Sequence, residues 1–205
     1  LVLNKPEGCL TTMDDPYGRP TVASLVPTDR YPGLFPVGRL DQDTTGVLLF
    51  MTDGELAARL LHPSTHVDKT YHARVAGRLS PFDVKRLCEG VELDDGMTAP
   101  AEVRTLSDFE GRDVCDPSMH AGDDLVEVVL HEGRKRQVKR MLSYVGHPVF
   151  RLNRVNFGPI TAAGLPVGKW RLLNAAEVEA LRKATETGRY TGTRPGVDPR
   201  SLKKS

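Results

Sequence analysis

The stretch that decides the fold is Gly38-Arg39-Leu40-Asp41-Gln42-Asp43-Thr44-Thr45-Gly46-Val47-Leu48-Leu49-Phe50-Met51. Residues 38–46 are mostly polar and rich in turn formers, whereas residues 47–51 are all apolar. A second apolar segment, residues 34–37, precedes the loop, so the pattern predicts two strands joined by a polar loop. Loops carried by a rigid sheet commonly hold catalytic groups, which makes this loop a candidate functional site.

Two acids in this loop allow two interpretations. Asp41 and Asp43 could form the carboxylate pair that a glycosidase places on either side of the scissile bond. Acids two residues apart in a turn also accept hydrogen bonds from neighbouring backbone amides. Spacing alone favours the second interpretation, in which the two carboxylates stabilise a turn.

The rest of the chain mixes helices and strands without a regular repeat. Ser80-Pro81-Phe82-Asp83 supplies an N-cap, a proline at N1 and an acid at N3, which predicts a helix as far as about Glu89. Thr52-Asp53-Gly54-Glu55 has capping-box spacing and predicts a helix start. Further strands are expected at 1–3, 69–75, 100–106, 125–130 and 149–157, and further helices at 135–144 and 175–184. The mixture predicts an α+β fold rather than a doubly wound sheet.

Charge is segregated along a nearly neutral chain. The 205 residues carry a formal net charge of +1. Residues 131–154 hold seven Arg or Lys against one Glu, whereas residues 89–127 hold twelve acids against two Arg. Such asymmetry indicates one face that binds a polyanion, although charge clusters are also found on ordinary solvated faces.

The basic cluster coincides with an amphipathic pattern. Val138, Met141, Leu142 and Val145 follow helical spacing, and most other positions are Lys or Arg. The predicted phosphate-binding side chains are Arg134, Lys135, Arg136, Lys139 and Arg140.

Several protein classes are excluded or disfavoured by composition. No apolar run approaches the roughly 18 residues that a membrane span needs. Cys9, Cys88 and Cys115 form no CxxC pair, and their odd number disfavours a disulfide framework, so we expect a reducing cytoplasm. The histidines and cysteines show no spacing typical of metal ligands.

Four ordered blocks resemble the ribosomal RNA pseudouridine synthases of the RsuA branch, from about residue 2 to residue 182. The blocks are Asn4-Lys5-Pro6-x-Gly8 with Gly18-Arg19-Pro20, Gly38-Arg39-Leu40-Asp41-x-x-Thr44-x-Gly46, Thr52-Asp53-Gly54-Glu55-Leu56-Ala57 with Lys69-Thr70-Tyr71, and Glu132-Gly133-Arg134-x-x-Gln137-Val138-Lys139-Arg140 with Leu152-x-Arg154. The resemblance implies a mostly antiparallel mixed sheet with flanking helices, arranged as two ferredoxin-like lobes around a central cleft. It also implies conversion of a uridine in ribosomal RNA to pseudouridine, with neither cofactor nor metal.

The resemblance further implies roles for individual residues. Asp41 matches the catalytic aspartate, Tyr71 the tyrosine that stacks on uracil, and Lys139 a basic residue paired with the aspartate. Leu152 matches a residue that lines the uracil pocket, and Arg39 is expected to contact the flipped nucleotide. Catalytically inert RNA binding remains an alternative, which the intact set of Asp41, Tyr71 and Lys139 disfavours.

The expected organisation is a catalytic domain over residues 1–187 followed by a basic, disordered tail over residues 188–205. Many members of the branch carry an S4-type RNA-binding domain before the Asn-Lys-Pro block, and we expect that domain to be absent from this chain. We expect a monomer that acts on ribosomal RNA in the cytoplasm.

Overall fold

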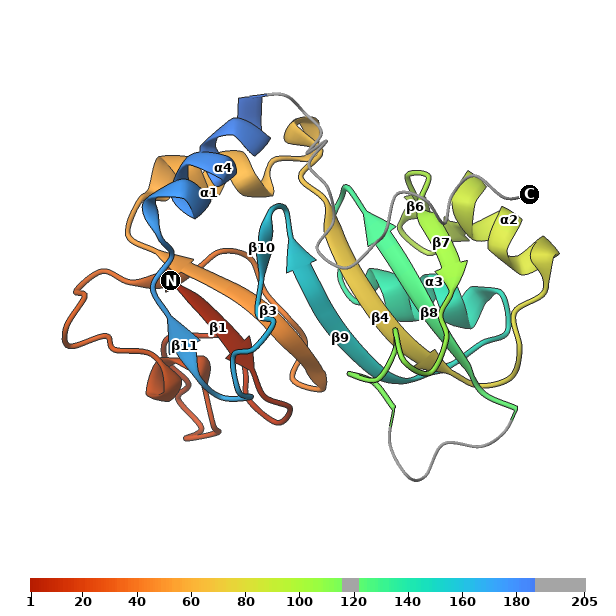
Figure 1. Ribbon diagram of the computed structural model, residues 1–205, viewed down its shortest axis with the longest axis horizontal. Coiled ribbons are helices and arrows are strands. Elements are labelled where there is room, and N and C mark those ends of the chain that lie inside the picture. Colours follow the sequence, from red (N-terminus) through yellow and green to blue (C-terminus); the bar gives the residue numbers. More distant parts are fainter. Residues whose placement is uncertain (116–121, 187–205) are drawn as a thin grey trace.

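The computed structural model describes residues 1–115 and 122–186, within which nine strands form one sheet (Figure 1). The strand order is β11-β1-β3-β9-β4-β8-β7, with β10 beside β9 and β2 beside β3. β3 and β9 are parallel, and the other pairings in the described sheet are antiparallel. The strands are β1 (Val2–Lys5), β2 (Phe35–Pro36), β3 (Thr44–Met51), β4 (Lys69–Val75), β7 (Glu102–Thr105), β8 (Asp124–Leu130), β9 (Val149–Phe157), β10 (Ile160–Thr161) and β11 (Trp170–Arg171); β5 (Glu92–Leu93) and β6 (Gly96–Met97) form a separate hairpin.

The helices of the described residues flank this sheet. They are α1 (Gly54–Leu61), α2 (Pro81–Glu89), α3 (Gln137–Tyr144) and α4 (Ala175–Glu186), with 3-10 turns at Val22–Leu25 and Pro63–Thr65. The mixed α+β fold with a mostly antiparallel sheet is therefore confirmed. None of the helices described here combines the length and apolar character that crossing a membrane requires.

Helices cover opposite faces in the two halves of the sheet. Val47 and Leu49 of β3 pack in one core with α1 and α4, whereas Ala73 of β4 and Leu152 of β9 pack in another with α2 and α3. Thr44 lies beside Leu152 in the parallel pairing. Because side chains alternate along a strand, the face that carries Thr44 and Leu152 is opposite to the face under α1 and α4.

Local capping signals predicted α2 accurately. The Ser80 hydroxyl accepts from the Asp83 backbone N–H, the Asp83 carboxylate accepts from the Ser80 N–H, and Pro81 occupies the first turn. At α1 the capping-box prediction was wrong by one residue, because Asp53 rather than Thr52 accepts from the Leu56 N–H. The Asp53 carboxylate thus caps α1 by accepting from a backbone N–H group that has no partner within the helix.

Several strand ends differ from the prediction by one or two residues, and two boundaries next to the Asp41 loop differ in a way that affects the site. β3 begins at Thr44 instead of residue 47, because the polar residues 44–46 pair with β9. α3 begins at Gln137 instead of residue 135, because Arg136 adopts the left-handed conformation with φ 51° and ψ 31°. Lys135 and Arg136 therefore precede the helix. The basic tail predicted at 188–205 lies outside the described residues.

Candidate active site

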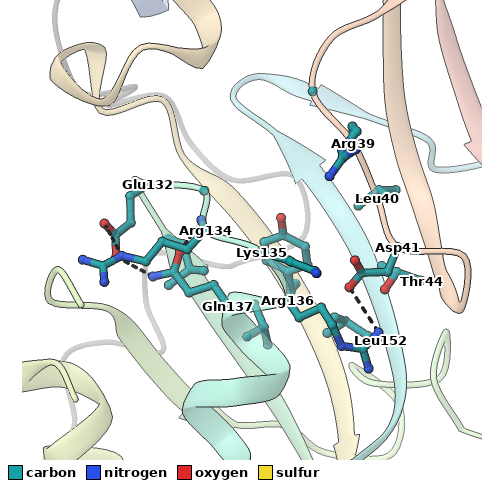
Figure 2. A pocket seen from close by; sticks show the side chains of 15 residues that line it. Arg39, Leu40, Asp41, Thr44, Glu132, Arg134, Lys135, Arg136, Gln137 and Leu152 are labelled. Atoms are coloured by element: carbon teal, nitrogen blue, oxygen red, sulfur yellow. Dashed lines mark hydrogen bonds and ion pairs between the residues drawn. The ribbon is translucent and has the colours of Figure 1, made fainter. Parts of the chain in front are cut away.

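Asp41 lies in the turn that leads into β3. The Thr44 backbone N–H donates to the Asp41 carbonyl oxygen over 3.1 Å, which closes a tight turn just before the strand pairs with its neighbours. The Asp41 side chain is about 30% exposed. Figure 2 shows its carboxylate on one side of a pocket, opposite the segment that precedes α3.

A fully buried lysine holds the backbone of this turn. Lys5 ends β1, and its Nζ donates to the carbonyl oxygens of Asp41 (3.1 Å), Gln42 (3.3 Å) and Thr44 (2.9 Å). Burial lowers the pKa of Lys5 below its usual value, and the nearby Cys9 and loop acids oppose that shift. The sequence analysis placed Lys5 in a motif block but did not predict that it binds the backbone of the Asp41 loop. The sequence offers one clue, because a lysine at the end of a buried strand needs buried acceptors. The loop that supplies these acceptors lies next to Lys5 in space but more than 30 residues away in sequence.

The pocket beside Asp41 has a volume of about 310 Å³ and combines an apolar wall with a basic rim. Leu130 of β8, Val138 of α3 and Leu152 of β9 form the apolar wall, and Tyr71 of β4 lies beside them. The volume is at the lower end of the range for small-molecule sites, which suits one nucleoside. The structure thus brings Asp41, Tyr71 and Leu152 together.

The pairing expected between Lys139 and Asp41 is wrong. Lys139 Nζ lies 2.7 Å from an Asp43 carboxylate oxygen, and Arg136 Nη1 lies 3.9 Å from Asp41 Oδ2 and 3.7 Å from Asp43 Oδ1. Because α3 begins after Arg136, that arginine extends toward the loop and Lys139 lies one turn further along the helix. The cation that faces Asp41 is therefore Arg136.

Asp43 is engaged in this ion pair and does not line the pocket. Partial burial opposes its ionisation, but the hydrogen bond and charge of Lys139 outweigh that effect and lower the pKa of Asp43. A glycosidase needs a second carboxylate facing the scissile bond, and its general acid must be protonated. Asp43 fits neither requirement.

Two of the predicted phosphate-binding arginines hold the β5–β6 hairpin instead. Arg134 donates to the carbonyl oxygens of Gly96 (2.9 Å) and Met97 (2.5 Å), and Arg140 pairs with Asp94 and, at 2.7 Å, with Asp95. The acids of the hairpin turn thus compete with phosphate for these cations.

The remaining predicted cations lie at the pocket. Arg39 and Lys135 are exposed side chains that line it, together with Arg136. Within the described residues no carboxylate pairs with Arg39 or Lys135, so both are available to an incoming anion.

Glu132 and Gln137 form a partly buried polar link to which sequence analysis assigned no role. Gln137 Nε2 donates to Glu132 Oε1 over 2.5 Å, and Gln137 Oε1 accepts from the Arg134 backbone N–H. Since Gln137 starts α3, this link sets the path of residues 133–136 along the pocket. Among residues 1–115 and 122–186 no group of three or more His, Cys, Asp or Glu side chains is placed to hold a metal ion.

The Asp41 carboxylate beside a pocket of about 310 Å³, with unpaired cations at the rim, is an arrangement that suits one nucleotide of a longer polyanion. A family model described as RNA pseudouridylate synthase matches residues 1–144, and the chain belongs to this family. The fold, recognised above from four sequence blocks, is thus confirmed as that of a pseudouridine synthase.

Similar proteins and solved structures support the same family assignment. The chain is 42% identical over 185 residues to an uncharacterized RNA pseudouridine synthase of Aquifex aeolicus, covering 90% of this chain and 70% of that protein. It is 43% identical to ribosomal large subunit pseudouridine synthase B of Yersinia pestis, covering 91% of this chain and 55% of the relative. A crystal structure of a pseudouridylate synthase superposes with a TM-score of 0.74 at 31% identity, covering 88% of this chain and 72% of that one. The chain spans between 50% and 65% of the length of the large-subunit relatives compared.

Proposed function

We propose that the chain isomerises a uridine in ribosomal RNA to pseudouridine, with Asp41 as the catalytic carboxylate. The observation that carries the proposal is the convergence of Asp41, Tyr71 and Leu152 on one pocket with Arg136 facing the carboxylate. The site would act on RNA in the cytoplasm as a monomer. Large-subunit ribosomal RNA is the favoured substrate, because similar proteins carry that activity in their names.

The reaction divides among these residues. Asp41 either attacks ribose C1′ or removes a proton from C2′, so that the bond from C1′ to uracil N1 breaks. The freed base rotates between Tyr71 and the apolar wall, and a bond forms from C1′ to C5. In the first route the bond between Asp41 and C1′ breaks as C5 attacks, and in the second route Asp41 returns the proton to C2′. The C5 proton then leaves to solvent and N1 takes up a proton, so the reaction is a net isomerisation. Arg136 Nη1 lies 3.9 Å from Asp41 Oδ2, so its positive charge faces the carboxylate across the pocket rim.

The uridine must leave its stack before it can reach Asp41. Extrusion of a base from a duplex costs a few kcal/mol. Arg39 and Lys135 lie at the pocket rim without carboxylate partners in the described part of the chain, which suits contact with the phosphates on either side of the extruded nucleotide. Lys139 pairs with Asp43 and does not line this pocket, so we assign it no contact with the substrate.

Tritium release tests the assignment directly. Transcripts of ribosomal RNA with 5-tritiated uridine should release tritium with the wild-type protein. Asp41→Asn should reduce release at least a thousandfold, because an amide is neither nucleophile nor base, while RNA affinity stays within about threefold. Asp43→Asn is the matched control in the same loop, and it should retain most of the release.

The position of pseudouridine in cellular ribosomal RNA tests which RNA is the substrate. Pseudouridine mapped in ribosomal RNA from cells with and without the gene should show loss of one site in the large-subunit RNA. Release by Asp41→Asn within tenfold of wild type would contradict the catalytic role of Asp41. Loss of a site in small-subunit RNA only would contradict the choice of subunit and leave the reaction intact.

A further inference from the structure

A second and larger pocket adjoins the active site along α3. Its volume is about 650 Å³, and Arg136 lines both pockets. From α3 it is lined by Lys139, Arg140, Ser143 and Tyr144, whose spacing places them on one helix face. The opposite wall comes from β5 and from the start of β9. The two pockets therefore meet at Arg136, and we call the second pocket the groove along α3.

An exposed stack of aromatic rings and arginine lies at the far end of this groove. Arg86 of α2 contacts two rings, with its Cζ 5.1 Å from the Tyr144 centroid and 5.8 Å from that of Phe82. Tyr144 is 46% exposed and Phe82 is 66% exposed. Nucleobases stack on aromatic faces and on guanidinium planes, so the stack has the chemistry of a single-strand binding platform.

The distribution of charge along the groove favours phosphate binding at its two ends. Lys139 and Arg140 are paired with acids, and Glu92 and Asp94 line the β5 wall, so the middle of the groove offers little net charge. Within the described residues no carboxylate pairs with Arg86. Phosphates are thus best bound near Arg136 and near Arg86, with the intervening nucleotides along α3.

The groove has the length of a short single strand. Arg136 and Tyr144 are eight residues apart along α3, which corresponds to about 12 Å of helix axis. Stacked nucleotides rise about 3.4 Å each, so a few nucleotides span this length.

We propose that this groove binds single-stranded RNA next to the target uridine, with one base stacked on Tyr144 beside Arg86. The placement rests on the proposed function, because that function puts the uridine in the first pocket. With this groove, the affinity of the protein for RNA would depend on unpaired nucleotides next to the reacting uridine. It would thus select uridines in single-stranded segments or in duplexes that open at one side.

Binding of short oligouridylates separates this surface from the active site. Fluorescein-labelled rU2, which is too short to reach Tyr144 from the first pocket, and rU12 would be titrated at 50 mM salt and followed by anisotropy. Tyr144→Leu should weaken rU12 binding at least fivefold, because loss of a base stack removes a substantial part of the affinity. The same substitution should leave rU2 binding within twofold. Tyr144→Phe keeps the ring and should bind rU12 like wild type.

A matched control removes a similar ring elsewhere. Phe109 is 77% exposed and stacks with Arg112 at 4.6 Å, but it lines neither pocket, so Phe109→Leu should leave rU12 binding unchanged. Thermal unfolding within about 3 °C of wild type shows that the variants are folded. As an independent signature, 2-aminopurine at one position of rU12 should lose fluorescence on binding wild type but not Tyr144→Leu.

Three results overturn the proposal. They are equal binding of rU12 by wild type and Tyr144→Leu, an equal loss with Phe109→Leu, and no measurable binding of rU12 by wild type. Since binding is measured without turnover, a failure of tritium release would contradict the proposed function and leave this test unaffected.

Discussion

At the scale of single residues, the buried ammonium of Lys5 holds the loop that carries Asp41. Lys5→Met should lower the free energy of unfolding by about 3 kcal/mol, because carbonyl oxygens of Asp41, Gln42 and Thr44 lose a charged donor inside the protein. Tritium release should fall as well, since the turn that carries Asp41 loses its anchor. Urea denaturation measures the first effect.

Lys85 supplies the control for this substitution. Its side chain is 71% exposed and, in the described part of the chain, pairs only with Glu89, one turn along α2. Lys85→Met should change the free energy of unfolding by less than about 0.5 kcal/mol. Equal effects of the two substitutions would show that the carbonyl contacts of Lys5 contribute nothing to stability.

Residue identity was easier to predict than residue partnership. Asp41, Tyr71 and Leu152 were chosen from the sequence, and they meet at one pocket. The partner of Lys139 could not be read in the same way, because a shift of two residues in the start of α3 moves each side chain by about half a turn. Arg134 looked like a phosphate ligand because the hairpin turn that it binds is about 40 residues away in sequence.

At the scale of elements, the only parallel pairing in the described sheet depends on a glycine. Gly46 has φ +102°, and a Cβ there would lie 2.3 Å from the Arg154 carbonyl oxygen and from Asn153 Oδ1. Gly46→Ala should therefore force β3 and β9 apart and lower the free energy of unfolding by about 3 kcal/mol. Thermal or urea denaturation measures it.

Gly54→Ala is the corresponding control. Gly54 begins α1, and a Cβ there meets nothing within 4 Å. The substitution should leave stability unchanged or raise it slightly, because alanine is the better helix former. If Gly46→Ala were tolerated equally well, close approach of the strands could not be the reason for that glycine.

The strands at 69–75 and 149–157 were predicted to the residue from their apolar pattern, but two boundaries that depend on contacts distant in sequence were missed. α2 was predicted to the residue because Ser80, Pro81 and Asp83 cap it within one turn. The start of β3 was missed because Thr44, Thr45 and Gly46 are polar or flexible and become strand only by pairing with β9, about 100 residues later. The start of α3 likewise depends on a bond between Gln137 and Glu132.

At the scale of the whole molecule, a polar network crosses the face of the sheet opposite to the active site. Thr45 Oγ1 donates to Asn153, Asn153 donates to Asp113, and His72 contacts Asp113 (2.6 Å) and Glu127 (3.5 Å). The network joins β3, β9, β4 and β8 directly behind Thr44 and Leu152. Because it links four strands and the segment after β7, its charge state affects the stability of the entire fold.

His72 makes that stability depend on pH. Burial opposes its protonation, but hydrogen bonds to Asp113 and Glu127 outweigh burial and raise the pKa of His72 to about 9. The unfolded value is about 6.5, so the stabilisation is fully present below pH 6.5 and is lost as pH rises through 9. The free energy of unfolding should fall over this window by about 2 kcal/mol relative to His72→Gln.

Urea denaturation at pH 6.0, 7.5 and 9.5 measures this difference between wild type and His72→Gln. The comparison is necessary because burial, together with the charge of Arg154, lowers the pKa of Lys69 to about 8, which changes stability in the opposite direction above that pH in both proteins. Asp113→Asn should retain part of the effect and move the window toward lower pH, because Glu127 remains as a partner. A difference that stays constant from pH 6.0 to 9.5 would show that His72 is not charged in the folded protein, and the network would then hold the strands together through neutral hydrogen bonds alone.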